Sequence, residues 1–265
     1  MRIQHNIMAM NANRNLTFNN SQLSKNLEKL SSGYRINRAG DDAAGLAISE
    51  KMRADIAIYD QAIKNANDGI SMVQTVEGAL TEVHSMLNRA ETLATQMANG
   101  TYSKANYTQV GYEITALNEE IARIAADTKF NGKKLFGAND PAKFQVSEGN
   151  AISLALNKFT LANITIDDLS DRTAAKDAMA AIKQSIDKVS GWRAQMGAVQ
   201  NRLEHTVNNL GVTMENLQNA ESQIRDTNVA EEMMKYTKNN ILIQSAQAML
   251  AQANQVPQGV LQLMQ

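Results

Sequence analysis

Apolar residues recur at every seventh position along two long stretches of the chain. The first repeat runs from Met52 to Ala94, and the second runs from Ile182 to Ile224. Seven consecutive apolar positions in each stretch predict two long helices that pack along a continuous stripe. At 1.5 Å per residue, each helix extends over roughly 65–80 Å. The repeated positions are Met52, Tyr59, Ala66, Val73, Leu80, Leu87 and Ala94, and then Ile182, Val189, Met196, Leu203, Leu210, Leu217 and Ile224.

A shorter apolar stripe lies between the two long ones and predicts a third helix. It follows the turn-like pair Asn99-Gly100 and ends before Phe130. This layout predicts a helical hairpin that folds back on the first long helix. The pair Asn131-Gly132 is typical of a tight turn that needs positive φ. The stripe comprises Val110, Ile114, Leu117, Ile121 and Ile124.

Residues 133–172 show a different pattern, in which apolar and polar residues alternate. A period of two with interspersed Gly and Asn predicts one or two β-hairpins. Because this region lies at the chain midpoint, the predicted fold is mainly α, with long antiparallel helical rods in a coiled-coil-like bundle and a small β-hairpin region. The alternating apolar residues are Phe144 and Val146, then Ile152, Leu154 and Leu156, then Ile164 and Ile166.

Both ends of the chain are striped but poor in charge. The first 27 residues contain no acid, and the last 27 contain no charged side chain. Neither end can bury its stripe within itself, so we expect the two ends to form a helical stem that is ordered only among other copies. Pro257 is expected to kink or end the last helix near Val256. The residues assigned to this assembly stem are Ile3, Ile7, Met10, Leu242, Met249, Val256, Val260 and Leu263.

These patterns predict two domains. Residues 1–42 together with residues 226–265 would form a terminal coiled-coil stem, which the family resemblance described below places in the inner core of a filament. Residues 43–225 would form a rod domain with a helical bundle and β-hairpins at about 133–172. The adjacent carboxylates Asp41 and Asp42 lie directly before the first long helix. A helix N-cap explains them better than a metal site or an acid–base pair, because adjacent side chains point in different directions.

Composition restricts the classes of function. The chain is 43% hydrophobic but only 5% aromatic, has two prolines and no cysteine, and carries a formal charge of −1. A net charge so close to zero argues against nucleic acid as a partner. No stretch of the sequence is apolar over enough residues to predict membrane insertion. The chain shows no Gly-rich phosphate loop, nucleophile elbow or zinc-binding helix, so we predict no enzyme activity, cofactor or metal. The N-terminus does not resemble a conventional cleaved signal peptide.

Several long segments resemble bacterial flagellin. They are the opening IQHNIMAMNANRNL, the segment SSGYRINRAGDDAAGLAISEKMR at 31–53, the segment TKFNGKKLF at 128–136, and the ending from ESQIRDTNVAEEM to QANQVPQGVLQLMQ. The resemblance covers residues 1 to about 136 and about 175 to 265. Only about 40 residues lie between these parts, so the chain resembles a short flagellin that has the core domains but no variable outer domains.

The resemblance implies a structural subunit of the bacterial flagellar filament, which self-assembles into a helical propeller for motility. The implied partners are other copies of the chain, the flagellar export apparatus, a chaperone and the cap protein. It implies export without a cleaved signal peptide and an extracellular location in the filament, or a periplasmic one if the source is a spirochaete. The alternatives are a hook–filament junction protein, which shares the terminal pattern, and a secreted helical binding module.

The resemblance also implies a secondary role as a ligand of a Toll-like innate immune receptor. The candidate patch, which family members also use for subunit packing, comprises Arg89, Leu93, Gln96 and Glu113. We expect Arg89 beside an exposed Leu93 to act as a binding hot spot. The plainer alternative is a solvated helix face on which Arg89 and Glu113 form a surface ion pair of little energetic value.

Overall fold

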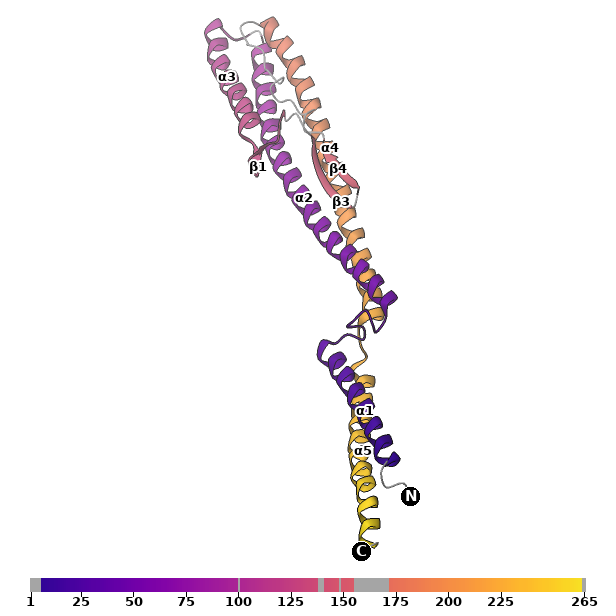
Figure 1. The fold of residues 1–265 in the computed structure, drawn as a ribbon. Coiled ribbons are helices and arrows are strands. Elements are labelled where there is room, and N and C mark those ends of the chain that lie inside the picture. Colours follow the sequence, from indigo (N-terminus) through magenta and orange to yellow (C-terminus); the bar gives the residue numbers. More distant parts are fainter. Residues whose placement is uncertain (1–5, 100, 138–140, 148, 155–171, 264–265) are drawn as a thin grey trace. The chain divides into compact units, whose positions relative to one another are not determined.

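The computed structural model describes residues 6–99, 101–137, 141–147, 149–154 and 172–263 (Figure 1). Contacts within the chain divide it into two compact units. One unit comprises Met1–Ile56 together with Glu215–Gln265, and the other comprises Ala57–Met214. The fold is mainly helical, as the repeats predict.

The unit Ala57–Met214 is built from parts of two long helices and one shorter helix. These are α2 (Ala43–Ala98), α3 (Lys104–Asp127) and α4 (Arg172–Arg225). The predicted heptad positions form their shared core, because the side chains of Val73, Leu80, Leu87 and Val189 are fully buried. The two long helices predicted from the seven-residue repeats are therefore confirmed.

Within this unit, α2 and α4 run in opposite directions. At one end, Arg172 Nε donates to the Ala98 carbonyl at 3.1 Å. Further along, the guanidinium of Arg193 on α4 lies 3.7 Å from the carboxylate of Glu77 on α2. The residue number rises on one helix as it falls on the other, which is the antiparallel pairing predicted for the rods.

Two short hairpins follow α3. Strand β1 (Lys129–Phe130) pairs with β2 (Lys133–Lys134) across Asn131 and Gly132, whose φ values are 49° and 78°. Positive φ at both central residues is typical of the tight turn predicted there. The hairpin begins before residue 133, because a two-residue turn at this pair requires strands on both sides of it.

The second hairpin confirms the period-two prediction. Strand β3 (Ala142–Ser147) pairs antiparallel with β4 (Asn150–Leu154), and Phe144 lies opposite Ile152. Val146, Ile152 and Leu154 are buried in the core of the unit, whereas their polar neighbours face outward. The predicted strand residues Leu156, Ile164 and Ile166 lie outside the described residues.

The other unit contains α1 (Ile7–Ser32) and α5 (Val229–Leu263), which pack together. Each is joined to a long helix by a short connection, residues 33–42 after α1 and residues 226–228 before α5. The two connections are joined by an isolated antiparallel β-bridge between Tyr34 and Asp226. Arg35 N donates to the Arg225 carbonyl at 2.7 Å, and Thr227 N donates to the Gly33 carbonyl at 2.9 Å.

Of the two effects expected of Pro257, a kink or an end of the helix near Val256, the end is not found: α5 continues through Pro257 to Leu263. A proline inside a helix removes one i→i−4 hydrogen bond and costs about 3 kcal/mol. Here the acceptor that loses its partner is the Ala253 carbonyl, which receives a hydrogen bond from Asn6 instead. Sequence reasoning about Pro257 takes only α5 into account, whereas the donor that compensates for the proline comes from α1.

Candidate functional site

The contact between α1 and α5 combines polar and small residues with partly buried leucines, since Leu16, Leu23 and Leu30 lie on the same face of α1 as Asn26. Among the described side chains of these two helices four are buried, and two of them, Asn26 and Glu232, are polar. The other two are Ile243 and Ala253. Because the leucines of this contact are only partly buried, the contact gives limited hydrophobic stabilisation by itself, since that term scales with buried apolar area.

A buried polar network lies toward one end of this contact, where α1 ends and α5 begins. With its amide oriented by its partners, Asn26 donates to Glu232 Oε1 at 2.9 Å and accepts from Asn239 Nδ2 at 3.0 Å. The Asn26 amide also donates to the Gln22 carbonyl at 3.1 Å, and Lys235 Nζ lies 3.4 Å from Glu232 Oε2. Buried polar groups are costly unless they are paired, so this network favours one alignment of the helices.

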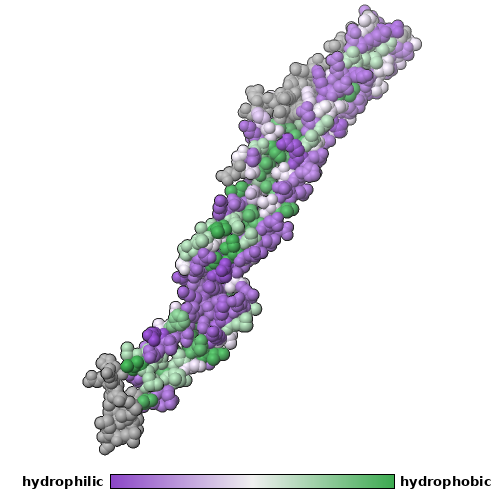
Figure 2. Space-filling model, turned by 90° about the vertical axis from the view of Figure 1, so that its right-hand side faces the viewer, coloured by the Kyte–Doolittle hydropathy of each residue, from purple (hydrophilic) through white to green (hydrophobic). Residues whose placement is uncertain are grey.

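Large apolar side chains lie mainly on the outer surface of the two terminal helices. Met10 is 65% exposed and Met249 is 60% exposed, although both are apolar. Green, apolar surface is visible beside purple, polar surface in Figure 2. On the described part of these helices, the large apolar residues that stay exposed include Ile7, Met8, Met10, Phe18, Leu27, Met233, Met234, Ile241, Leu242, Met249 and Val256.

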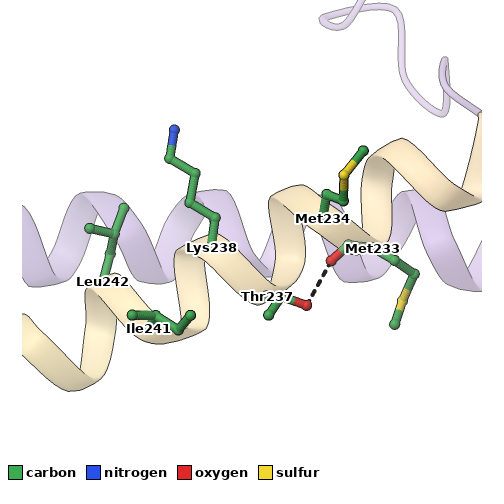
Figure 3. Close-up of a pocket in the computed structure, with 6 residues that line it drawn as sticks. All are labelled: Met233, Met234, Thr237, Lys238, Ile241 and Leu242. Carbon is green, nitrogen blue, oxygen red and sulfur yellow. Dashed lines mark hydrogen bonds between the residues drawn. The ribbon is translucent and has the colours of Figure 1, made fainter.

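Part of this outer surface forms a shallow apolar pocket on α5 (Figure 3). Thr237 satisfies its hydroxyl locally, since Oγ1 donates to the Met233 carbonyl at 2.9 Å. The pocket is therefore left with methionine and branched aliphatic side chains, and Lys238 supplies its charged group. Its lining residues are Met233, Met234, Thr237, Lys238, Ile241 and Leu242.

The predicted assembly residues lie on this outer surface rather than between α1 and α5. Ile7, Met10, Leu242, Met249 and Val256 are all exposed. Ile3 and the side chains of Val260 and Leu263 lie outside the described residues. Sequence reasoning missed the inner residues Asn26 and Glu232, because polar side chains do not contribute to an apolar stripe. A polar residue at a position that continues the buried face of a helix was the available signal.

The candidate receptor patch is only partly exposed. Arg89 Nε on α2 donates to Glu113 Oε1 on α3 at 2.8 Å, and both side chains are about half exposed, 55% and 43%. This hydrogen bond from the guanidinium to Glu113 raises the pKa of Arg89. Gln96 is also exposed, and its Nε2 donates to the Tyr102 hydroxyl at 3.0 Å.

Leu93 was expected to be exposed beside Arg89, and that expectation is wrong. Its side chain is only 3% exposed and belongs to the buried core. Leu93 follows Ala90 by three residues and precedes Met97 by four, so all three share the apolar face of α2. In the free chain the patch therefore presents Arg89, Gln96 and Glu113.

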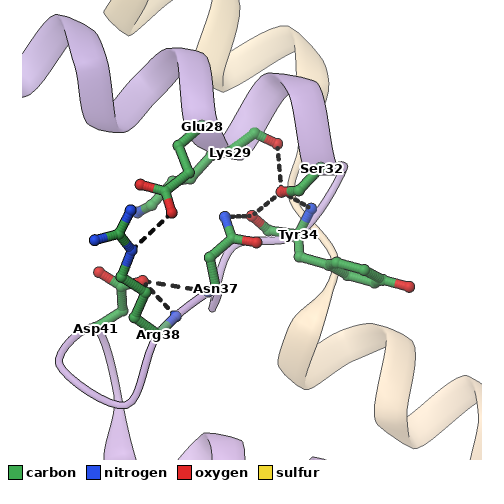
Figure 4. A network of polar contacts seen from close by, with 7 residues as sticks. All are labelled: Glu28, Lys29, Ser32, Tyr34, Asn37, Arg38 and Asp41. Carbon is green, nitrogen blue, oxygen red and sulfur yellow. Dashed lines mark hydrogen bonds and ion pairs between the residues drawn. The ribbon is translucent and has the colours of Figure 1, made fainter.

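The connection between α1 and α2 is held by a polar network (Figure 4). Asp41 Oδ2 accepts hydrogen bonds from the backbone N–H groups of Asn37 at 3.2 Å and Arg38 at 3.1 Å. The Arg38 bond is the largest cause of the lowered pKa of the Asp41 carboxyl. Arg38 Nε in turn donates to Glu28 Oε1 at 2.8 Å, which ties the connection to the end of α1.

The neighbouring carboxylate caps α2. Asp42 Oδ1 accepts from the N–H of Gly45, in the first turn of α2, at 2.9 Å. The predicted N-cap is confirmed, and Asp42 is the residue that performs it, whereas Asp41 organises the preceding turn. The same unit holds an ion pair in which Arg225 Nη1 lies 2.6 Å from Glu50 Oε1 and lowers the pKa of that carboxyl.

The described part of the chain contains neither a metal-binding cluster of side chains nor a helix that could span a membrane. No group of three or more His, Asp or Glu side chains there has the geometry to hold a metal ion. No described helix carries an apolar stretch long enough to cross a bilayer.

Comparison with known proteins identifies the family. Residues 3–140 match the family model described as the bacterial flagellin N-terminal helical region, and residues 179–264 match the bacterial flagellin C-terminal helical region. The chain is 52% identical over 271 residues to a flagellin of Halalkalibacterium halodurans, with both proteins covered completely. It is 46% identical over 303 residues to a flagellin of Bacillus subtilis, again with complete coverage of both.

A solved structure agrees with these matches. The crystal structure of Bacillus cereus flagellin superposes with a TM-score of 0.51 at 29% identity, covering 56% of this chain and 88% of that one. The family matches reach from residue 3 to residue 264 and include both terminal helices. The chain therefore belongs to the bacterial flagellin family, whose members are structural subunits of the flagellar filament.

Proposed function

We propose that this flagellin assembles by burying the apolar outer surface of α1 and α5 against other copies of the chain. The observation that carries the proposal is the placement of large apolar side chains such as Met10, Ile241 and Met249 in solvent. An exposed apolar surface of this extent is typical of an interaction site. The inner contact between α1 and α5 is already made in the single chain, so the outer surface supplies the main hydrophobic gain on assembly.

The charge pattern of the two helices supports the same proposal. The last 27 residues carry no charged side chain, and the first 27 carry three cations and no acid. Identical helices that pack at close spacing would bring like charges together, and burying unpaired ions is costly. A neutral surface avoids both costs. The ordering of the stem then accompanies its docking at the end of a growing filament, where head-to-tail contacts generate a helical polymer.

The proposal includes a route and a location. The chain leaves the cell through the flagellar export apparatus with the help of a chaperone, and the cap protein promotes its addition at the filament tip. The filament is then extracellular, or periplasmic if the source is a spirochaete. The likeness to flagellins along the whole chain favours a filament subunit over a hook–filament junction protein or a secreted helical binding module.

Seeded elongation tests the assembly proposal. Purified chain added to short filament fragments is expected to lengthen them, and removal of residues 239–265 is expected to abolish growth. Met249→Ser, which removes one exposed apolar side chain, is expected to slow growth while leaving the melting temperature of the monomer unchanged. The matched control is Tyr112→Ser, since Tyr112 is also large and 73% exposed but lies on α3. Growth of the truncated chain at the wild-type rate would exclude the proposal.

We also propose that monomers present Arg89, Gln96 and Glu113 to a Toll-like innate receptor. The favouring observation is the exposed Arg89–Glu113 pair, which places a guanidinium at the centre of a surface formed by α2 and α3. Arginine is among the residues that most often dominate binding interfaces. Family members use this patch for subunit packing as well, so receptor binding and assembly would compete for it.

A further inference from the structure

Pro257 leaves one carbonyl of α5 without its usual helical donor. In a regular helix the N–H of each residue donates to the carbonyl four residues earlier. Proline has no N–H, so the Ala253 carbonyl receives nothing from position 257. A buried carbonyl without a partner is costly, and Ala253 is 6% exposed. Yet α5 continues as helix through this point to Leu263.

Asn6 of α1 supplies the missing donor. Its Nδ2 donates to the Ala253 carbonyl at 2.7 Å, across a separation of 247 residues in sequence. The other end of the same amide is the N-cap of α1, since Oδ1 accepts from Ala9 N at 3.1 Å. The cap requires an acceptor, so it fixes the orientation of the amide with the NH₂ group toward α5.

We propose that Asn6 is a positioning residue that docks the start of α1 on the carbonyl freed by Pro257 and thereby aligns the two terminal helices. Regular helical bonds occupy the neighbouring carbonyls of α5, so a shift of α1 by one turn would leave both the Asn6 amide and the Ala253 carbonyl without this bond. Small side chains near this contact, such as Ala9 and Ala253, give little resistance to such a shift. The polar contact at Asn6 therefore adds specificity at an end of the helix pair where packing supplies little.

The same contact links two events in the stem. Docking of α1 satisfies Ala253, and a satisfied Ala253 favours continuation of α5 beyond Pro257. The last turns of α5 are therefore stabilised by the first turn of α1. Helicity of residues 257–263 and attachment of the N-terminal helix are expected to rise and fall together.

A double-mutant cycle on full-length chains tests the proposal. Asn6→Ser keeps an N-cap acceptor but removes the amide donor, and Pro257→Ala restores the helical donor to Ala253. In the wild-type background, Asn6→Ser is expected to raise the critical monomer concentration for seeded filament growth about five-fold, as expected for the loss of one hydrogen bond. In the Pro257→Ala background, the same change is expected to raise it less than two-fold. An equal effect in both backgrounds would overturn the proposal.

A second comparison does not require the Pro257 variant to assemble. Asn6→Asp is isosteric and keeps the cap, but it turns a carboxylate oxygen toward the Ala253 carbonyl. It is expected to impair growth more than Asn6→Ser and to speed hydrogen exchange at residues 254–263 within filaments. If Asn6→Asp filaments grow and exchange as the wild type does, Asn6 does not position the helices and the proposal fails.

Discussion

Asn26 of α1 donates a hydrogen bond to Oε1 of Glu232 on α5 at 2.9 Å, and both side chains are buried. We expect Asn26→Ala to weaken the pairing of α1 with α5 by about 1–3 kcal/mol, because it leaves a buried carboxylate without one of its donors. The measurement is the temperature at which filaments dissociate.

The matched control for this prediction is Asn15→Ala, which alters an exposed asparagine of the same helix. It is expected to leave the dissociation temperature nearly unchanged. Replacing both Asn26 and Glu232 by Leu is expected to recover stability, since apolar residues often replace buried polar pairs without loss. Equal dissociation temperatures for Asn26→Ala and the wild type would show that the network does not stabilise the pair.

Arg89→Ala is expected to weaken receptor binding by at least about 1 kcal/mol, because a central arginine is a typical hot spot. The measurement is titration of a soluble receptor ectodomain with monomeric chain. Stability of the chain should hardly change, since an exposed ion pair such as Arg89–Glu113 contributes little. Arg123→Ala on α3 is the control, since Arg123 also pairs with an acid in solvent. Unchanged affinity of the Arg89 variant would remove this residue from the patch.

Leu93→Ala is expected to act through stability instead. Its side chain is buried in the core of the bundle, so the change creates a cavity and costs about 2–5 kcal/mol. Urea unfolding measures this cost. Any loss of receptor binding by this variant is expected to follow the loss of folded monomer, whereas Arg89→Ala should reduce binding of a fully folded chain.

Gly45→Ala is expected to destabilise the start of α2. A Cβ at this position would lie 2.5 Å from Asp42 Oδ2 and 2.9 Å from Ile36 Cδ1, so the capping side chain would have to move. Loss of an N-cap costs about 1 kcal/mol. Gly78→Ala is the control in the same helix, since a Cβ there meets nothing within 4 Å.

The control is expected to change stability in the opposite direction. Alanine inside a helix is favoured over glycine by about 0.5–1 kcal/mol, so Gly78→Ala should stabilise the chain. Denaturant unfolding of both variants gives the two free energies. A stabilising effect of Gly45→Ala would show that Asp42 and Ile36 adjust without loss.

Acid is expected to weaken the connection between α1 and α2. In the folded chain the pKa of Asp41 lies below its usual value, chiefly because the Arg38 N–H donates to the carboxylate. The ionised form therefore stabilises the folded state at and above about pH 4, the usual pKa of an aspartate, and this contribution is lost as the pH falls through the lower folded pKa. Asp41→Asn should reduce the melting temperature at pH 6 but have little effect near pH 2.

The long helices and the hairpin turn were predictable because their signals are local or periodic. The heptad positions from Val73 to Leu87 are buried as the repeat requires, and Asn131-Gly132 adopts the positive φ values that its residues favour. The burial of Leu93 was not predictable from its neighbours in sequence, because it depends on how far α3 covers α2. Sequence spacing identifies an apolar face but does not reveal how far a neighbouring helix extends over it.

The polar contacts of the terminal helices were beyond sequence reasoning for a different reason. Asn6 and Ala253 are 247 residues apart, so their contact depends on the alignment of α1 with α5. An apolar stripe predicts that a helix has a partner, but it does not by itself specify which of several alignments the two helices adopt. The sequence shows that Pro257 disturbs the hydrogen bonding of α5. The group that compensates for it, the Asn6 amide, lies at the other end of the chain.

The paired connections give the chain a mechanical property. Gly33 and Arg35 follow α1, and they are hydrogen-bonded to Thr227, within the connection between α4 and α5, and to Arg225, the last residue of α4. Tension or torque applied to α1 therefore reaches α4 directly through these bonds, as well as α2 through the covalent chain. Neither connection therefore bears the load alone. This arrangement suits a subunit of a rotating filament better than two connections that could rotate independently.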